Sequence, residues 1–302
     1  MDFLTIFFVL PTVFDYSTRV NVLFFYMTWT TLVMSHTALR LELWGTLLVR
    51  LVFFFFPSIV FFIFDTAASS TAVSFKERGE AGLPTGSKRT KPMVKEAKIA
   101  GWAIANFALS FTLQMLLEGF LIKTPGLRPA IQTSLSIPMP WRITTQLLWG
   151  FLARETLYYT IHRFILHSKL PVFAYLVKCH GSWYHSLITP FPLTAHYDHP
   201  AAYLLSTFIP MYLPALFFRF HMITFLVYTV IISLEETLVF SGYSAMPSYF
   251  LVAAARRVEA HLAADGRSHF GRWGIADILA GTGGYGEFNA AAGDGGSSGT
   301  RR

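Results

Sequence analysis

The sequence predicts an all-α fold, a polytopic bundle of membrane helices that carries a histidine-rich cap on its cytosolic side. Hydrophobic residues make up 53% of the 302 positions, and charged residues make up only 14%. The mean hydropathy of +0.47 is that of a polytopic membrane protein. Six of the ten histidines fall within residues 162–199, at the edge of an apolar segment. The composition therefore predicts the bundle, and the histidine cluster predicts the cap.

Charge and cysteine content exclude several classes of protein. The formal net charge of +7 is spread over loops and forms no basic groove with interleaved aromatic residues, so we expect no nucleic-acid partner. Basic loops beside apolar spans are instead typical of contact with anionic membrane lipids. Cys179 is the only cysteine, which excludes a disulfide framework and a multi-cysteine zinc site.

We expect N-terminal membrane segments within residues 1–65. Residues 20–35 form a marginal span, and residues 47–64 form a second one. Arg50 lies near one end of the second span, where its long side chain can snorkel to the head groups. Pro57 lies inside the same span and predicts a kink.

A basic cytosolic loop is predicted at residues 66–98. From Ser69 on, this stretch is polar, contains glycine and proline, and carries seven Lys or Arg residues against three Glu. An excess of basic residues marks the cytosolic side of a membrane protein. At the other end of the chain, residues 283–302 have too few apolar side chains to form a core, so we expect a disordered tail.

Residues 99–282 are predicted to form the catalytic domain. Its expected helices are 99–122, 143–166 and an apolar pair at 201–218 and 222–240, in which Pro210 and Pro214 predict a broken or re-entrant hairpin. If residues 66–98 are cytosolic, one crossing at 99–122 and a return at 143–161 bring His162 back to the cytosolic face. The apolar pair leaves and returns, so the clustered histidines and His261 meet on one side, as a single metal centre requires.

The histidines are the candidate metal ligands, because neutral imidazole is the commonest side-chain ligand of redox-capable transition metals. The candidates are His162, His167, His180, His185, His196, His199 and His261, with Glu259, Asp265 and His269 as tentative additions. Imidazoles favour a non-haem iron centre over magnesium or calcium, which prefer oxygen ligands. A zinc enzyme is the main alternative, although the H-E-x-x-H motif of zinc proteases is absent from the sequence.

The spacing of the histidines predicts how they converge. His162 and His167 are five residues apart, so they meet only if His167 lies beyond a helix end, which Pro171 favours. His196 and His199 are three residues apart, a spacing compatible with two ligands on one helical turn.

Glu155 precedes His162 by seven residues and shares its helix face. Two helical turns separate the two residues by roughly 10.5 Å of rise, too far for both to bind one ion. We therefore expect Glu155 to orient a ligand through hydrogen bonds, with Tyr159 beside it in the same supporting role.

Four pieces of sequence, in order, resemble the fatty acid hydroxylase superfamily, which includes sterol desaturases and C4-methyl sterol oxidases. The pieces are ETLYYTIHRFILH at 155–167, HSLITPFPLTAHYDHP at 185–200, SGY at 241–243 and HFGRWGIADILAGT at 269–282. The resemblance covers about residues 140–282. It implies an endoplasmic-reticulum enzyme in which histidines bind two irons, and which uses O2 and an electron donor to hydroxylate or desaturate a lipid-like substrate. The sequence shows no electron-transfer domain, so the expected donor is a separate protein such as cytochrome b5 or a reductase.

The resemblance also assigns ligands residue by residue. Matches to the first histidine box are His162 and His167, and matches to the last histidines of the second and third boxes are His185 and His261. The histidines that follow the second box are matched by His196 and His199.

The second and third boxes depart from the usual H-x-x-H-H pattern. Gly181 and Tyr184 stand at two histidine positions of the second box, where His180 is displaced by one residue. Arg257 and Ala260 stand at two histidine positions of the third.

Phe240 stands where several members of the superfamily have a further histidine.

Two interpretations of the function remain open. In the first, the protein is an active membrane iron oxidoreductase in which Glu236, Glu259 or Asp265 supplies missing ligands. In the second, it is a metal-poor pseudoenzyme that serves as a lipid-binding or scaffolding membrane subunit, because lost ligands lower metal affinity steeply.

Overall fold

The predicted all-α fold is confirmed by the computed structural model, which describes residues 16–85, 94–187, 189–244, 246, 248–263 and 269–281. Over these residues the chain forms helices and two isolated β-bridges but no strand. The helices before the histidine-rich region are α2 (Tyr16–Ser35), α3 (Ala38–Arg50), α4 (Phe56–Ala67), α5 (Ser69–Phe75), α6 (Val94–Lys123) and α7 (Pro140–Ile161). Those that follow are α8 (Ala174–Trp183), α9 (Pro200–Tyr203), α10 (Ile209–Phe217), α11 (Met222–Val239), α12 (Tyr249–Ala263) and α13 (Ile275–Leu279).

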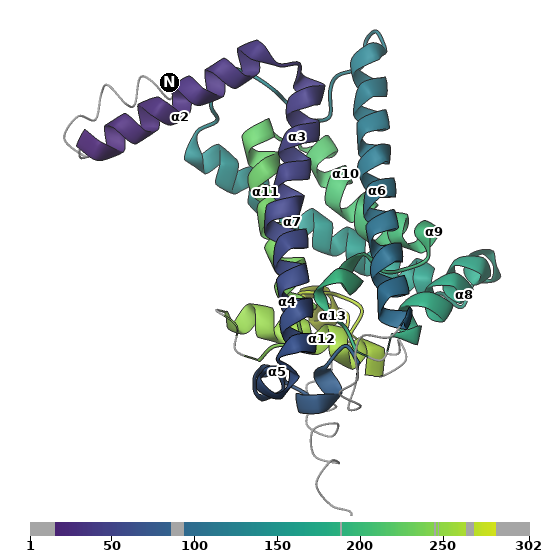
Figure 1. Ribbon diagram of the computed structural model, residues 1–302. Helices are drawn as coiled ribbons and strands as arrows, with labels where there is room; N and C mark the ends of the chain where they lie inside the picture. Colours follow the sequence, from purple (N-terminus) through teal and green to yellow (C-terminus); the bar gives the residue numbers. More distant parts are fainter. Residues whose placement is uncertain are drawn as a thin grey trace, which may run out of the picture.

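Among the described residues, four helical segments are long and apolar enough to cross a membrane, as expected of an integral membrane protein. They are Ala38–Ala67, Lys95–Lys123, Pro200–Phe217 and Met222–Val239. The marginal span predicted at 20–35 is too short to qualify, and Figure 1 shows α2 running across one end of the bundle instead of through it. The span predicted at 47–64 begins nine residues earlier, at Ala38, because Thr37 caps that helix by accepting a hydrogen bond from the Arg40 amide.

Two of these spans contain a π-helical turn just before a proline. The turn Leu51–Phe55 joins α3 to α4 just before Pro57, and the turn Leu204–Phe208 joins α9 to α10 just before Pro210. In an uninterrupted α-helix the proline ring clashes with the carbonyl four residues earlier. The wider turn moves that carbonyl away, so the helix continues where the sequence predicted a kink and a broken hairpin.

Arg50 does not snorkel to the head groups, so that prediction was wrong. Its side chain is 2% exposed and lies between α3 and α11, where its guanidinium is 2.7 Å from the Glu236 carboxylate. It also donates a hydrogen bond of 3.2 Å to the Ser233 hydroxyl. The sequence separation of 186 residues hid this partner, and a paired charge inside a bundle is stable where a lone one is not.

Helix α11 lies at the centre of the bundle, and its buried side chains include Phe225, Tyr228 and Ile232. Helix α7 packs against α10 and α11. Phe220 is fully buried against α7 at Gly150, where a Cβ atom would lie 2.4 Å from its ring. Glycine at position 150 therefore permits the close approach that sets the position of α7, the helix that leads into the histidines.

The polar segments gather at one end of the bundle (Figure 1), where α5, α12 and α13 surround the end of α4. Lys76, from the stretch predicted to be a cytosolic loop, is buried and lies 2.6 Å from the Asp65 carboxylate at the end of α4. Its ammonium also donates a hydrogen bond to the Ser241 carbonyl after α11. Nearby, Thr189 donates to the Ala81 carbonyl at 2.9 Å. Residues 69–85, which include α5, thus form part of the histidine-rich end of the protein.

We predict that Arg50→Ala lowers the free energy of unfolding by about 3 kcal/mol, because it leaves the Glu236 carboxylate buried without its closest cation. The expected loss is at the low end for a broken buried pair, since Arg272 remains 3.6 Å from Glu236. Thermal unfolding in detergent should show a midpoint several degrees below that of the wild type. Arg40→Ala, at an exposed position of the same helix, is the control. Equal midpoints for the two variants would contradict the prediction.

Candidate metal centre

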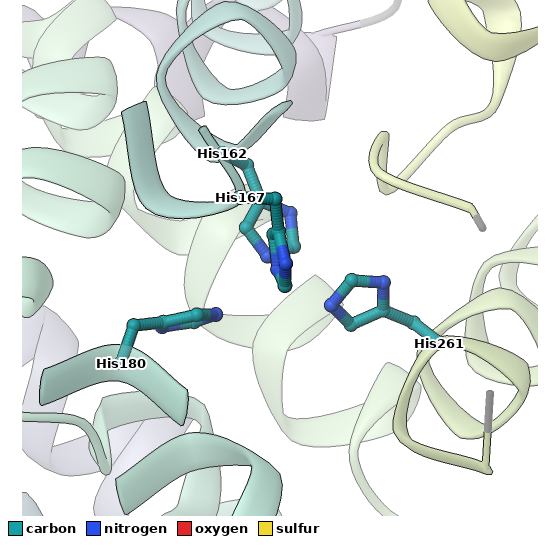
Figure 2. Close-up of side chains that lie close together, drawn as sticks. All are labelled: His162, His167, His180 and His261. Atoms are coloured by element: carbon teal, nitrogen blue, oxygen red, sulfur yellow. The ribbon is translucent and has the colours of Figure 1, made fainter. Parts of the chain in front are cut away.

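Imidazole rings from three separated segments meet at the polar end of the bundle. Figure 2 shows four of them, His162, His167, His180 and His261, pointing toward one another. His185 joins them, with its Nε2 atom 3.4 Å from that of His167 and its ring centroid 5.0 Å from that of His261. The centroid of the His167 ring lies 4.9–5.1 Å from those of the other four.

The ring nitrogens are close enough to share a metal ion. One nitrogen from each of the four histidines in Figure 2 lies within 4.8 Å of the others. Four nitrogens around one ion in a tetrahedron, each about 2.0–2.1 Å from it, are about 3.4 Å apart. Inward movements of less than about 1 Å therefore suffice to bring all four into coordination.

A π-helical turn brings His162 and His167 together. It spans His162–Leu166 at the end of α7, and the His167 amide donates a hydrogen bond of 3.0 Å to the His162 carbonyl. His167 follows the turn with non-helical backbone angles, as the spacing of five residues requires. The wide turn places the two rings, which a straight α-helix would separate, on the same side.

His180 and His185 converge through a different local structure. His180 lies in the last turn of α8, which ends at Trp183, and His185 lies in the 3-10 turn Tyr184–Ser186 that follows. Their ring centroids are 5.1 Å apart. His261 completes the cluster from the last turn of α12.

Hydrogen bonds at Nδ1 orient two of the rings. The Nδ1 atom of His162 donates to the Phe270 carbonyl at 2.8 Å, since a carbonyl oxygen only accepts. The Nδ1 atom of His180 lies 2.6 Å from the Asp198 carboxylate. The Nε2 atoms of both histidines are buried and have no hydrogen-bond partner. This is the arrangement of metal-binding histidines, in which one nitrogen is held by the protein and the other faces the ion.

The loop that carries the Phe270 carbonyl is held by two carboxylates. Asp277 accepts hydrogen bonds from the amides of Phe270 at 3.0 Å and Gly271 at 2.7 Å. Glu155 accepts from the Trp273 amide at 2.8 Å. A Cβ atom on Gly271 would lie 2.9 Å from oxygens of both acids, so only glycine fits between them.

Glu155 therefore acts on the cluster through the backbone of this loop and not by direct contact with His162. Its neighbour Arg154 pairs with Glu235 at 2.8 Å. Tyr159, the other predicted supporting residue, accepts a hydrogen bond from Arg163.

Burial keeps the imidazoles of His162 and His167 neutral. It holds the pKa of His162 well below the ordinary value of 6.5, and the neighbouring histidines His261, His180 and His167 lower it further. Burial, followed by repulsion from His261, His180 and His185, lowers the pKa of His167 to about 2. At neutral pH each of these two rings therefore has a nitrogen lone pair that is free of a proton and available to a cation.

Comparison with known proteins identifies the part of the chain that builds this cluster. Residues 147–282 match the family model described as fatty acid hydroxylase. The chain carries a fatty acid hydroxylase domain. The superfamily predicted from the histidine boxes is thereby confirmed.

Two relatives illustrate the range of the similarity. Methylsterol monooxygenase 2-2 of Arabidopsis thaliana is 31% identical over 159 residues, which cover 52% of this chain and 54% of that protein. A very-long-chain aldehyde decarbonylase of Oryza sativa subsp. indica is 37% identical over 120 residues, which cover 38% of this chain and 42% of that protein. The chain thus spans about half the length of the curated relatives it matches. No solved structure matches it significantly.

Two histidines of the fatty acid hydroxylase domain lie outside the cluster. The Nδ1 atom of His196 is 2.6 Å from the Tyr203 hydroxyl, and its Nε2 atom is 3.4 Å from Glu236. His199 caps α9 by accepting a hydrogen bond from the Ala201 amide at its Nδ1 atom. The two residues do not share a helical turn, as their spacing had suggested, because Tyr197 between them is extended.

The tentative additional ligands lie outside the group of four histidines. Glu236 belongs to the ion pair with Arg50. Glu259 lies near the cations Arg78 and Lys76, and its buried Oε1 atom has no hydrogen-bond partner. His269 is buried and has a positive φ of 58°. Asp265 lies outside the described residues.

Sequence reasoning missed Asp198 and Asp277, the two aspartates that support the cluster. Asp198 was visible as the acidic residue of the HYDHP segment, between two candidate ligands. Asn106 on α6 fixes this segment by donating to the carbonyls of His196 at 3.0 Å and Asp198 at 2.7 Å. Asp277 belongs to the quoted piece HFGRWGIADILAGT, but only the fold shows that its carboxylate caps the loop amides.

A cavity of about 20 Å³ adjoins the cluster. Its lining includes His162, His180, Tyr158, Tyr184, Phe240 and Arg272. This volume accommodates one water-sized molecule. The fatty acid hydroxylase domain therefore has room beside the imidazoles for a small ligand such as O2, whereas a lipid chain requires side chains to move.

We predict that the metal-free protein loses stability as the pH falls below about 6.5. The pKa values of His162 and His167 are depressed in the folded protein, so these two imidazoles stay neutral while those of the unfolded chain take up protons. Each of the two histidines then costs about 1.4 kcal/mol per pH unit. Unfolding in detergent, followed from neutral pH to about pH 5, should show this slope.

His167→Ala should flatten the slope by about one proton, because the pKa of His167 is depressed to about 2 in the folded state. The control is His36→Ala, at an exposed position, which should keep the wild-type slope. If the slopes of the wild type and of His167→Ala coincide, the imidazole at position 167 is not buried in its neutral form.

Proposed function

We propose that this protein is a membrane-bound non-haem iron oxidoreductase that uses O2 to hydroxylate or desaturate a hydrophobic lipid, sterol or related substrate. The observation that carries the proposal is the convergence of five imidazoles at one end of a bundle of membrane helices. Imidazoles clustered at a membrane face have few uses other than metal binding.

The residues present fit an iron ion. The Nε2 atoms of His162 and His180 are buried without hydrogen-bond partners, and their Nδ1 atoms are held by Phe270 and Asp198. Imidazole nitrogens suit iron and disfavour magnesium and calcium, which take oxygen ligands. When bound, iron would supply the one-electron and O2 chemistry that no protein side chain provides.

The protein's own residues would bind and shield the reaction. The imidazoles would hold the ion, and Asp198 and the Phe270 carbonyl would fix the orientation of two of them. Tyr158, Tyr184 and Phe240 line the small adjoining cavity and would limit access of bulk water.

The substrate class is inferred from the setting of the cluster and from the relatives. The cluster lies at the end of apolar helices, so a substrate dissolved in the bilayer can approach it directly. The names of the two relatives refer to a methylsterol and to a very-long-chain aldehyde, both hydrophobic.

We also propose that the cluster faces the cytosol of an endoplasmic-reticulum membrane. The basic stretch 66–98 contributes residues to the same end of the bundle, and basic segments stay on the cytosolic side. Electrons would then reach the iron from a separate cytosolic donor such as cytochrome b5 or a reductase.

A second candidate function is a metal-poor pseudoenzyme that binds lipid or scaffolds other membrane subunits. The observation that favours it is the loss of box histidines at Tyr184, Arg257 and Phe240. Arg257 packs its guanidinium against Gly274, where no side chain would fit, so its position is structural. Iron content discriminates between the two candidates.

The experiment is to purify the protein in detergent after growth with iron and to profile lipids of cells that express it. We expect bound iron in the wild type and none in His167→Ala, together with lipid products whose added oxygen derives from labelled O2, or which carry a new double bond. His199→Ala, outside the cluster, is the matched control and should retain iron. Folded wild-type protein without iron or products would favour the pseudoenzyme.

We predict that Asp198→Ala lowers iron affinity by about 10–100-fold, because His180 loses the carboxylate that orients it. Competition with a chelator measures the affinity. Glu77→Ala, which removes a partly exposed ion pair with Arg256 at the same end of the protein, should leave it unchanged. An Asp198→Ala protein that binds iron as tightly as the wild type would show that the carboxylate does not support the site.

A further inference from the structure

We infer that this centre holds one metal ion and not the pair expected from the resemblance, and that the five clustered imidazoles are its ligands. The inference rests on the proposed function in one respect, that the cluster binds iron. It concerns how many ions the described residues can hold, and it follows from how the rings are arranged and from what fills the space beside them.

The five rings form one compact group. His162, His180, His185 and His261 form a closed circuit in which successive ring centroids are 5.3, 5.1, 5.0 and 4.6 Å apart. His167 lies 4.9–5.1 Å from all four. Four of the rings offer nitrogens within 4.8 Å of one another, and His185 joins them with its Nε2 atom 3.4 Å from that of His167. Ligands of two ions would instead divide into two groups.

A second ion lacks ligands of its own. Two-metal sites place ions about 3.5–4 Å apart, and each needs several protein donors. The histidines, acids and cysteine of the described residues provide one group of metal-binding geometry, that of His162, His167, His180 and His261.

Three of the remaining candidate donors have other partners. His196 and His199 bond to Tyr203 and to the start of α9, and Glu236 pairs with Arg50. The buried Oε1 atom of Glu259 has no hydrogen-bond partner, but neither Glu259 nor His269 belongs to the group of metal-binding geometry.

A permanent positive charge lies in the cavity beside the cluster. The Tyr184 ring stacks on that of His180, with centroids 5.1 Å apart and an angle of 16°. Beyond it, buried Arg272 lies in the same cavity as His162 and His180 and extends its guanidinium 4.7 Å from the centre of the Tyr158 ring. Its counter-ion, Glu236, is 3.6 Å away. A second metal cation here would meet this guanidinium in a medium of low dielectric constant, where like charges repel strongly.

The cavity beside the cluster has a consequence for ligand binding. Its lining includes His162 and His180 together with Tyr184 and Arg272. An exogenous ligand of the size of O2 would fit this cavity, with the Arg272 guanidinium close enough to attract negative charge.

The test is the number of irons per chain in iron-loaded full-length protein, measured by plasma mass spectrometry against amino-acid analysis. We expect one. In the oxidised protein an isolated ferric ion has an odd number of electrons and gives an electron paramagnetic resonance signal, whereas a coupled ferric pair has an even number and is silent. The expected result is a signal that accounts for all the iron.

Variants identify the ligands. Alanine substitutions at His162, His167, His180, His185 and His261 should each lower iron content, whereas His196→Ala, His199→Ala, Glu259→Ala and Asp265→Ala should keep one iron per chain. Size-exclusion profiles and helical circular dichroism of the metal-free variants establish that each has folded.

Two irons per chain with a silent spectrum would overturn the single-ion inference and leave the proposed oxidoreductase intact. Loss of half the iron in His196→Ala or Asp265→Ala would do the same. Folded wild-type protein with no iron would reject both the inference and the proposed function.

Discussion

Five imidazoles in mutual contact, three of them buried and two partly exposed, impose the constraint on which the rest of this structure depends. The Nε2 atoms of His162 and His180 are buried and have no hydrogen-bond partner. Protonation does not relieve this at His162 or at its neighbour His167, because burial and the neighbouring rings depress the pKa values of these two side chains. A bound cation does relieve it, because it satisfies all the lone pairs at once. A metal centre therefore accounts for the cluster. Without a cation, buried nitrogens that lack hydrogen-bond partners would destabilise the fold.

The fold meets this constraint by rigid support from several elements. A π-helical turn at the end of α7 brings His162 and His167 to one side, and the capped loop after residue 269 fixes the tautomer of His162. Asn106 on the membrane helix α6 holds the backbone that presents Asp198 to His180. The groups that orient the ligands thus come from the membrane helices, from the polar end of the bundle and from the C-terminal loop. The metal centre and the bundle therefore form one structural unit.

A second buried polar system lies beside the first. Glu236 lies near three positively charged or protonatable groups, Arg50 at 2.7 Å, His196 at 3.4 Å and Arg272 at 3.6 Å. This network joins α3 and α11 to the loop that supports the cluster. It also explains why two residues that sequence patterns offered as ligands, His196 and Glu236, have a structural role: Glu236 is paired with Arg50, and His196 is hydrogen-bonded to Tyr203.

The sequence by itself determined the helical class, most of the apolar spans and the family, because length, hydropathy and histidine spacing are local properties that a linear pattern contains. It also named all five clustered histidines. Tertiary structure alone decided that His196 and His199 stay outside, that Arg50 is paired within the bundle, and that Asp198 and Asp277 support the site. These outcomes depend on which residues meet across separations as large as 186 positions. Such meetings follow from packing in three dimensions, which no periodicity along the chain encodes.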